Sequence, residues 1–347
     1  MIVLFVSCRG HHPSEYQSSC RYAGYFDLVM GEDGQCRAVT IISPFDSSVD
    51  TIHIDSSPSS IVCMSSSHVA CLSAVGSGHL IKGVSGIRYI TDDAIRKRAL
   101  SEGSDRVLDI GYDGNMDFEG IISLEPDHIF GYALSSSTSP SISKLQSLGL
   151  KVNVIYDHLE KHPLARAEYV RFFGALTGRL EEADSIFNEV CSRYETASAG
   201  MRGSEPVKVL LNVPYADVWY IPGEDSYMAR LVNDAGGVVL GAAGGTATSE
   251  AVSLEKAYAL SKEADLWLNP GSCRSRTELA ALHPLFPQFG PLLRNLPIYN
   301  NTLRITPEGG NDFWESGVVR PDLILEDLCD ILSGNSDDSS LNYFFPL

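Results

Sequence analysis

The chain has 347 residues, of which 44% are hydrophobic and 20% are charged, and it is long enough for two globular domains. Its formal net charge of −18 argues against nucleic acid and against an anionic membrane surface as main partners, but not against a basic protein or a cationic ligand. The sequence has no apolar run of about 18 residues, so it predicts no transmembrane helix.

The N-terminus is apolar up to Cys8 and polar beyond it. Phe5-Val6-Ser7-Cys8 is similar to a bacterial lipobox, in which the Cys becomes the lipidated first residue of the mature chain. We interpret residues 1–8 as the remnant of a lipoprotein signal peptide, with Cys8 as the lipidation site, and residues 9–20 as a tether. The alternative is a hydrophobic first strand that ends in an incidental Cys. A lipidated Cys8 would anchor the protein to a membrane without spanning it.

The remaining cysteines do not predict a metal site. No two of them form a CxxC pair, and no His lies at zinc-finger spacing from them. We therefore expect no metal ligands, and the spacing assigns no disulfide among Cys20, Cys36, Cys63, Cys71, Cys191, Cys273 and Cys329.

Residues 21–160 predict an α/β lobe. A β-hairpin is expected over residues 25–42, and buried strands are expected at 61–64, 81–84, 107–110 and 152–155. Helices are expected at 68–75 and 140–148, the second with Ser139 as its N-cap. Strands that alternate with helices in this way predict a mostly parallel sheet.

A short pattern occurs once in each half of the chain. In the first copy Glu119 is followed by Leu124 and then by Asp127 and an apolar run. In the second copy Glu255 is followed by Leu260 and then by Asp265 and Leu266-Trp267-Leu268. Each copy predicts a capped helix start, a short helix, a turn and a buried strand, so the pattern indicates two similar lobes.

The segment between the two copies of the pattern lacks the alternation of strands and helices. From Pro163 to about residue 196, apolar residues recur at helical spacing, and Gly174 and Gly178 are the main breaks. We predict one long helix, or two nearly collinear helices bent at the glycines, over residues 161–200. Alternation resumes over residues 205–333, the second lobe, and residues 334–347 are expected to be a loosely packed tail. The predicted fold is α/β, with two Rossmann-like lobes of mostly parallel sheets joined by one long backbone helix.

With these elements in order, the chain resembles the substrate-binding proteins of ABC importers for ferric siderophores, haem and cobalamin. The resemblance covers roughly residues 58 to 333. It depends on Ile61-Val62-Cys63-Met64-Ser65, on the run from Ala74 to Ser85, on Glu119 through Asp127, on Leu145 through Val152, and on Leu231 through Gly237. One branch of that family, common in Bacteroides-type bacteria, is similar to this chain at three further places: His162-Pro163-Leu164, Asn311 through Glu315, and Arg320-Pro321-Asp322.

The resemblance gives the two glutamates of the repeated pattern a role. In that family they lie on the outer tips of the lobes and dock onto arginines of the permease dimer, and by residue match they are Glu119 and Glu255. Carboxylates at helix N-termini stay ionised and pair well with guanidinium groups. The alternative is that each Glu only supports the start of its helix.

The resemblance also places the ligand between the lobes. The residues that it implies as ligand contacts are Ser66, Tyr89, Tyr112, Tyr132, Trp219, Tyr220, Tyr227, Trp314 and Arg320. Aromatic side chains offer rigid, flat contacts to macrocycles and catecholates, although a Tyr in an α/β loop more often packs structurally. An anionic siderophore would need arginines, for which Arg88, Arg274, Arg276 and Arg320 are candidates, and haem would need an axial residue such as Tyr89, Tyr112 or His68.

The function implied is capture of an iron complex, a ferric siderophore or haem, by a periplasmic and lipid-anchored monomer that delivers it to an inner-membrane permease. The ligand is cargo, so no cofactor is expected, and nucleic acid is not a partner. Three alternatives stay open: a cobalamin- or corrinoid-binding protein of the same class, an enzyme that handles metal chelates on the same fold, and a free-standing lipoprotein that scavenges ligand. The sequence shows no P-loop, HExxH or nucleophile motif for the enzyme, and the paired glutamates speak against the scavenger.

Overall fold

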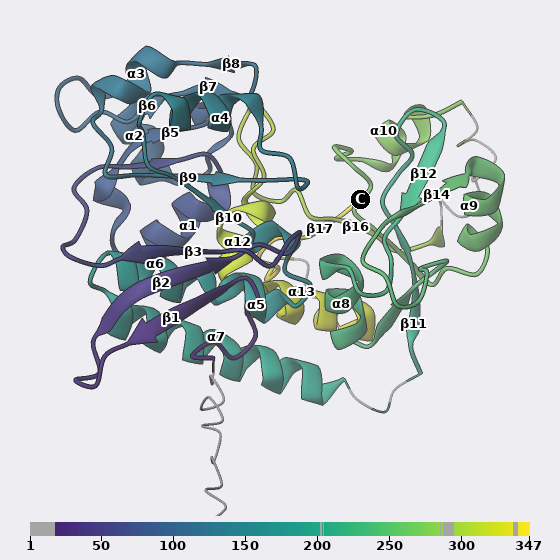
Figure 1. The fold of residues 1–347 in the computed structure, drawn as a ribbon. Helices are drawn as coiled ribbons and strands as arrows, with labels where there is room; N and C mark the ends of the chain where they lie inside the picture. The colour runs from purple at the N-terminus through teal and green to yellow at the C-terminus, as the bar shows by residue number, and fades with distance from the viewer. Residues whose placement is uncertain (1–17, 202, 204, 285, 287–294, 336–338) are drawn as a thin grey trace, which may run out of the picture.

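The computed structural model describes residues 18–201, 203, 205–284, 286, 295–335 and 339–347. Two lobes lie side by side, and helices join them along one side of the molecule (Figure 1). None of the described helices has the length and hydropathy that crossing a bilayer requires. The expected signal remnant with Cys8 and most of the expected tether lie outside the described residues.

The N-terminal lobe is built on a five-stranded parallel sheet with the order β10-β9-β4-β5-β6. Central strand β4 is apolar and buried throughout, as expected where helices cover both faces of a parallel sheet. The strands are β4 (Ile61–Cys63), β5 (Ile81–Val84), β6 (Leu108–Asp109), β9 (His128–Tyr132) and β10 (Val152–Ile155). The helices are α1 (Ser66–Ala74), α2 (Asp93–Ala99), α3 (Phe118–Ser123) and α4 (Pro140–Ser147), with 3-10 turns η1 (Gly78–Leu80), η2 (Ile87–Tyr89) and η3 (Asp157–Leu159).

A second, antiparallel sheet precedes this one. The predicted hairpin is confirmed as β1 (Phe26–Met30) and β2 (Cys36–Ile42), and β3 (Val49–His53) adds a third strand that the sequence did not predict. The sheet packs on the joint through Phe26, whose ring contacts Tyr169 in a tilted and Phe172 in an edge-to-face arrangement. A short pair, β7 (Gly111–Tyr112) and β8 (Asn115–Met116), lies before α3.

The C-terminal lobe repeats the plan with the order β13-β11-β15-β16-β17, in which only β17 is antiparallel. The expected loose tail is wrong, because β17 joins this sheet and Tyr343 and Phe344 are buried. The strands are β11 (Val207–Leu211), β13 (Gly237–Val239), β15 (Leu266–Leu268), β16 (Ile298–Asn300) and β17 (Phe345–Pro346), with a separate pair β12 (Val218–Ile221) and β14 (Glu250–Ser253). The helices are α8 (Tyr227–Asp234), α9 (Leu254–Ser261) and α10 (Arg276–Ala281).

The repeated pattern has the same structure in both lobes, which confirms that prediction. Each copy forms a short capped helix, α3 or α9, followed by a buried strand, β9 or β15. The aspartate of each copy also has the same contact: Asp127 accepts hydrogen bonds from the backbone N–H groups of Ser59 and Ser60, and Asp265 accepts one from Lys208. Each aspartate therefore ties its strand to the start of the lobe's first strand.

The predicted long backbone helix is confirmed for the second part of residues 161–200 only, and the expectation that the first part is collinear with it is wrong. The segment forms α5 (Pro163–Ala167), α6 (Tyr169–Leu176) and α7 (Leu180–Gly200), and α6 turns back to pack against α7. Gly178 takes the left-handed conformation, with φ 70°, and the N–H of Arg179 donates to the carbonyl of Gly174 at 2.7 Å, which closes α6 as a Schellman turn. Only α7 runs on towards the C-terminal lobe.

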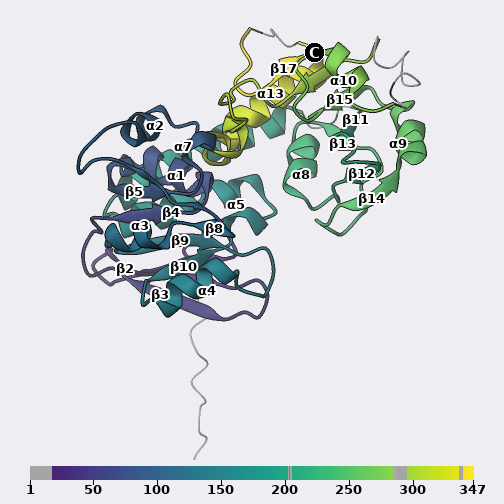
Figure 2. The same cartoon turned by 90° about the horizontal axis from the view of Figure 1, so that it is seen from above.

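The chain also returns to the joint after β16. The returning segment contains η5 (Asp312–Trp314) and α12 (Ser316–Val319), and it leads into α13 (Pro321–Ser333), which packs along α7 between the two lobes (Figure 2). Glu315 on this segment accepts hydrogen bonds from the N–H groups of Thr91 and Asp92 of the N-terminal lobe, both at 2.8 Å. The joint is therefore made of several packed helices and a returning segment.

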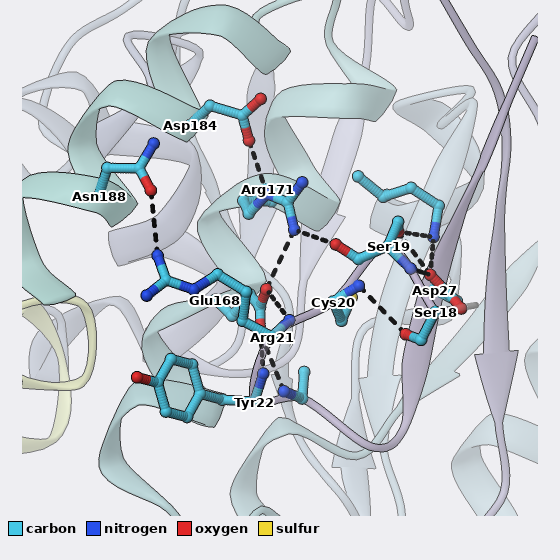
Figure 3. A network of polar contacts seen from close by, with 12 residues as sticks. Ser18, Ser19, Cys20, Arg21, Tyr22, Asp27, Glu168, Arg171, Asp184 and Asn188 are labelled. Carbon is cyan, nitrogen blue, oxygen red and sulfur yellow. Dashed lines mark hydrogen bonds and ion pairs between the residues drawn. The ribbon is translucent and has the colours of Figure 1, made fainter.

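A buried carboxylate fastens the start of the described chain to the same joint (Figure 3). Glu168 is 0% exposed and accepts hydrogen bonds from the backbone N–H groups of Arg21, Tyr22 and Ala23, each at 2.8 Å. Arg171 balances its charge at 3.0 Å and donates a further hydrogen bond to the carbonyl of Ser19. A buried carboxylate is tolerated in a protein interior when it is fully hydrogen-bonded and paired with a cation, as Glu168 is. Its hydrogen bonds hold the irregular segment at residues 21–23 in place.

The packing of α6 on α7 predicts that Gly→Ala substitutions at two positions of these helices have opposite effects on the free energy of unfolding. A Cβ at Gly174 would lie 2.4 Å from the Cβ of Ala183 and 2.9 Å from the carbonyl oxygen of Arg179. Gly174→Ala should therefore lower the free energy of unfolding by about 1–3 kcal/mol, measured by urea denaturation. The matched control is Gly200→Ala, because an added Cβ there meets no described atom within 4 Å, and we expect it to stabilise by up to ~1 kcal/mol. A stabilising Gly174→Ala would contradict the close approach of the two helices.

Glu315 predicts a pH dependence of stability. Burial raises its pKa from 4.5 to about 7, against the opposing effect of the two N–H donors. The folded state thus binds this proton more tightly than the unfolded state, and the resulting stabilisation is full below pH 4.5 and is lost as the pH rises through about 7. Wild type should therefore lose stability relative to Glu315→Gln over that interval, measured as the free energy of unfolding against pH. The exposed Glu308 of the same segment gives the control Glu308→Gln, and parallel profiles for wild type and Glu315→Gln would refute the assignment.

Candidate functional site

The strand order of each lobe indicates where a ligand would bind. In the parallel sheet of the N-terminal lobe the chain starts at β4, moves outward to β5 and β6, and then returns to the other side as β9 and β10. In the C-terminal lobe it starts at β11, moves to β13, and returns as β15 and β16. In open α/β sheets, ligands bind outside the carboxyl ends of the strands where the order reverses. These switch points lie between β4 and β9 and between β11 and β15.

Two predicted ligand residues lie at neighbouring strand ends beside the first switch point. Ser66 is partly exposed and begins α1, just after β4, because Ser65 caps that helix and accepts from the N–H of Ser67. Tyr132 is the last residue of β9 and keeps 38% of its surface exposed. In Figure 1, β9 ends on the side of the lobe that faces the C-terminal lobe.

Tyr89 and Tyr112 form a second exposed group at this edge. Their ring centroids lie 6.0 Å apart, and the guanidinium of Arg88 lies 5.0 Å from the centre of the Tyr89 ring. Tyr112 covers Gly86, where a Cβ would lie 1.9 Å from its hydroxyl oxygen, so the glycine makes room for the ring. The result is an aromatic platform with an arginine beside it.

A buried polar cluster lies behind Tyr132. Asp157 accepts a hydrogen bond from the hydroxyl of Ser67 at 2.6 Å, and it lies 3.6 Å from His68 and 3.8 Å from His158. His158 in turn lies 5.7 Å from the Tyr132 ring. His68 is 1% exposed, so the expectation that it could serve as an axial ligand is wrong in this structure.

The prediction for Trp219 is also wrong. Its side chain is fully buried, its indole N–H donates to the carbonyl of Leu211 at 2.9 Å, and its ring packs on Trp267. The physical reason is the alternation along β12, which turns Trp219 into the core and Tyr220 to solvent. Tyr220 therefore remains a candidate contact.

Tyr227, Trp314 and Arg320 differ in where they lie. Tyr227 is mostly buried with the guanidinium of Arg166 4.7 Å from its ring, so it packs at the joint. Trp314 remains 41% exposed on the returning segment. Arg320 is engaged by Asp322 at 2.6 Å, and it lines a cavity of about 730 Å³ between α1, α7 and the returning segment. The structure does not bring Arg320 to the strand ends.

Sequence reasoning missed the polar residues at the second switch point. Asn212 follows β11 and Asn269 follows β15, both with positive φ, 70° and 57°. Tyr215, in the loop after β11, is 81% exposed. A signal was present, since three parallel strands of this lobe run directly into asparagine, at Asn212, Asn269 and Asn300. Asparagine tolerates the left-handed conformation that ends a strand abruptly.

Two further cavities, of about 560 and 710 Å³, lie beside the joint and share His162 and Arg230 in their lining. Both flank α8 and include Pro206 before β11, and the larger one extends along β13 to Val239 and Ala242. The described residues contain no group of three or more His, Cys, Asp or Glu side chains that could hold a metal ion.

The glutamates of the repeated pattern are exposed and equivalent. Glu119 and Glu255 are each the second residue of their helices, α3 and α9, after the caps Asp117 and Ser253. Among the described residues neither carboxylate has an ion-pair partner within 4.0 Å. The pKa of Glu255 is lowered by its own backbone N–H group and by the hydroxyl of Ser253, so this carboxylate stays ionised. The two helices lie on different lobes, at the outer edges of the molecule (Figure 1).

Comparisons with known proteins agree with this architecture. Residues 61–280 match the family model described as periplasmic binding protein. A curated relative, an uncharacterized lipoprotein of Methanocaldococcus jannaschii, is 25% identical over 82% of this chain and 67% of its own. Among solved structures, a periplasmic heme binding protein from Pseudomonas aeruginosa has a TM-score of 0.59 at 17% identity, covering 83% of this chain and 98% of that one. The periplasmic vitamin B12 binding protein of Vibrio cholerae has a TM-score of 0.58 at 14% identity, covering 81% and 98%.

Since the family model spans well over half of the chain, and the two-lobe fold with its helical joint is shared with those solved structures, the chain belongs to the periplasmic binding protein family.

Proposed function

We propose that this protein is the substrate-binding component of an ABC importer, which captures an iron complex between its lobes and delivers it to a permease dimer. The observation that carries the proposal is the placement of exposed aromatic side chains at the strand ends of both lobes. Tyr132, Tyr89 and Tyr112 are exposed on one lobe, and Tyr220 and Tyr215 on the other. Binding sites for flat or macrocyclic chelates are lined by such rings, which lose little conformational entropy on binding.

The joint supports delivery without a large closing motion. Helices α7 and α13 pack together along the connection, and Glu315 ties the returning segment to the N-terminal lobe. Such a connection holds the two lobe tips at a nearly constant separation. A permease dimer with one arginine-bearing surface per subunit could then engage Glu119 and Glu255 together.

Haem or a ferric siderophore is the proposed cargo, and the phenol oxygen of Tyr89, Tyr112 or Tyr132 would lie near its metal. A corrinoid is the second candidate, which the same aromatic edges favour and which the structural similarity to a vitamin B12 binding protein supports. Members of this family serve as transport components, so we propose binding and not catalysis.

The proposed location is the periplasm, with the chain anchored to a membrane through a lipid on Cys8 and working as a monomer. The relative from Methanocaldococcus jannaschii is itself described as a lipoprotein, which supports this proposal. The net charge of −18 is consistent with a protein that does not bind nucleic acid.

Reversing the charge of Glu119 and Glu255 tests whether these residues are needed to deliver the cargo to the permease. The double variant Glu119→Lys with Glu255→Lys should abolish uptake of the cargo in cells, because lysines would repel the arginines of the permease. Its affinity for the cargo should stay within about twofold of wild type, because both residues lie on helices α3 and α9 at the outer edges of the molecule (Figure 1). The matched control is Glu308→Lys, an exposed site on the returning segment. Normal uptake by the double variant would exclude docking through these residues.

The cargo class is tested by the visible absorption of protein purified from its native host. Haem, ferric catecholates and corrinoids each have distinct bands, and titration of the stripped protein with the same compounds should restore the bands. Tyr132→Ala should weaken that binding about tenfold or more, since a buried aromatic contact is among the strongest single contacts in such sites. A protein that carries no chromophore and binds none of the three compounds would refute the proposed function.

A further inference from the structure

The cavity of about 730 Å³ that Arg320 lines is separate from the site proposed for the cargo. It is bounded by the second half of α1, the beginning of α2, one side chain of α7 and the returning segment. Neither Ser66 nor any of the exposed tyrosines described at the strand ends belongs to its lining. A molecule bound there would therefore occupy a second place in the protein.

The walls of this cavity present more apolar than polar surface. Ala70 and Ala74 come from α1, Ile186 comes from α7, and Ile305 and Val319 come from the returning segment. Ile305 keeps 40% of its surface exposed and Ile186 is partly exposed, so apolar surface is open to solvent here. Sites for small molecules are typically apolar hollows with a few polar groups, and this cavity has that composition.

Most carboxylates in the lining already have partners. Asp312 accepts a hydrogen bond from the hydroxyl of Thr91 at 2.8 Å and lies 3.3 Å from Arg304. Glu315 accepts from the N–H groups of Thr91 and Asp92. Asp92 in turn caps α2 by accepting from the first N–H groups of that helix. These three carboxylates are therefore not available to bind a cation.

Two hydrogen-bond donors in the lining have no partner. The guanidinium of Arg96 and the hydroxyl of Ser73 make no hydrogen bond or ion pair among the described residues, and both residues are partly buried. Arg98 on the same helix differs, because its guanidinium donates to the carbonyl of Ile81 at 2.8 Å. A partly buried guanidinium without a partner favours an anionic group beside it. Asp93 at the rim is exposed, so water weakens the repulsion that its charge exerts on an anion.

We propose that this cavity is a second ligand site, which binds a small molecule with an apolar body and one anionic group. The apolar body lies against the walls, and the anionic group accepts hydrogen bonds from Arg96 and Ser73. This inference goes beyond the proposed function and does not depend on it.

The cavity lies behind the loop that carries the aromatic platform of the N-terminal lobe. The returning segment forms one of its walls, and the same segment holds the backbone of that loop. Thr306 donates to the carbonyl of Arg88, and Glu315 accepts from residues 91–92. A ligand that contacts the returning segment therefore stabilises the support of Tyr89, so its occupancy is coupled to the strand-end site.

The test uses the full chain and the dye 1-anilinonaphthalene-8-sulfonate, an aromatic sulfonate with one negative charge that fluoresces in apolar surroundings. Octanoate, octanol and octylammonium, which share a chain length and differ in charge, then compete with the bound dye. Octanoate should displace the dye at about a fivefold lower concentration than octanol, and octylammonium should displace it least. Arg96→Gln should weaken octanoate binding about fivefold and change octanol binding less than about twofold. Saturating octanoate should also slow amide hydrogen exchange of residues 91–96 in wild type.

A second variant fills the cavity without removing charge. Ala74 is exposed at the rim, so Ala74→Phe should fold and should weaken dye binding at least about tenfold. The matched controls are Ala259→Phe at an exposed position of α9 and Arg106→Gln at an exposed position before β6, both outside this lining, and each should stay within about twofold of wild type. Circular dichroism confirms that each variant folds.

Three results would overturn the site: no saturable dye binding by wild type, unchanged dye binding by Ala74→Phe, or unchanged hydrogen exchange of residues 91–96 with octanoate. Displacement by octylammonium as readily as by octanoate, or wild-type octanoate binding by Arg96→Gln, would overturn the anionic ligand. These measurements contain no cargo and no permease, so their failure leaves the proposed function to its own tests.

Discussion

The whole molecule depends on buried carboxylates that accept hydrogen bonds from consecutive backbone N–H groups of distant, irregular segments. Glu168 holds residues 21–23, Glu160 holds residues 24–25, Glu315 holds residues 91–92, and Asp327 on α13 holds residues 342–344. Burial raises the pKa of three of them, Glu160, Glu315 and Asp327, which is the energetic cost of placing these groups inside. Because a buried carboxylate is tolerated only when its oxygens are satisfied, each contact specifies one arrangement of the segment that it holds. All four lie on the joint or next to it, so the joint and the segments around it are stabilised together.

The two lobes are variations of one structural unit, and the repeated sequence pattern marks the same part of that unit in each lobe. Strands β5, β4 and β9 correspond to β13, β11 and β15, and in both sets the chain begins at the central strand. Asp127 and Asp265 tie the third strand to the beginning of the first in both lobes. Glu119 and Glu255 then start equivalent helices and are both left exposed. Asp117 and Ser253 already supply the caps of these helices, so the equivalence of the two lobes extends to an exposed carboxylate in the first turn of each helix.

Local pattern was sufficient to predict most strands and helices of both lobes, because apolar periodicity and caps are encoded within about ten residues. The errors have long-range causes. The backbone helix has good helical periodicity on both sides of Gly178, and only the packing of Gly174 on Ala183 reveals that α6 folds back. The burial of Trp219 could not be predicted because the strand pair β12–β14 joins segments that are 29 to 35 residues apart in the chain. The sequence predicts a loosely packed tail because Asp327, which holds residues 342–344, lies on a helix earlier in the chain. The exposed tyrosines could be predicted as a group, whereas the buried Asn269 oxygen without a hydrogen-bond partner among the described residues could not, since a missing partner is visible only in three dimensions.

The carboxylate contacts and the candidate site are physically connected at one loop. Residues 88–92 carry Arg88 and Tyr89 on their exposed side, and the returning segment holds their backbone: Thr306 donates to the carbonyl of Arg88, and Glu315 accepts from Thr91 and Asp92. Gly310 lies so close that a Cβ there would be 2.1 Å from the carbonyl oxygen of Tyr89. The same segment presents Trp314 to solvent, one residue before Glu315. The aromatic platform of the N-terminal lobe is thus positioned by chain that belongs, in sequence, to the C-terminal lobe. A ligand held between Tyr89 and the second lobe would contact surfaces whose relative placement is already fixed by hydrogen bonds, so its binding energy would not be spent on closing the lobes.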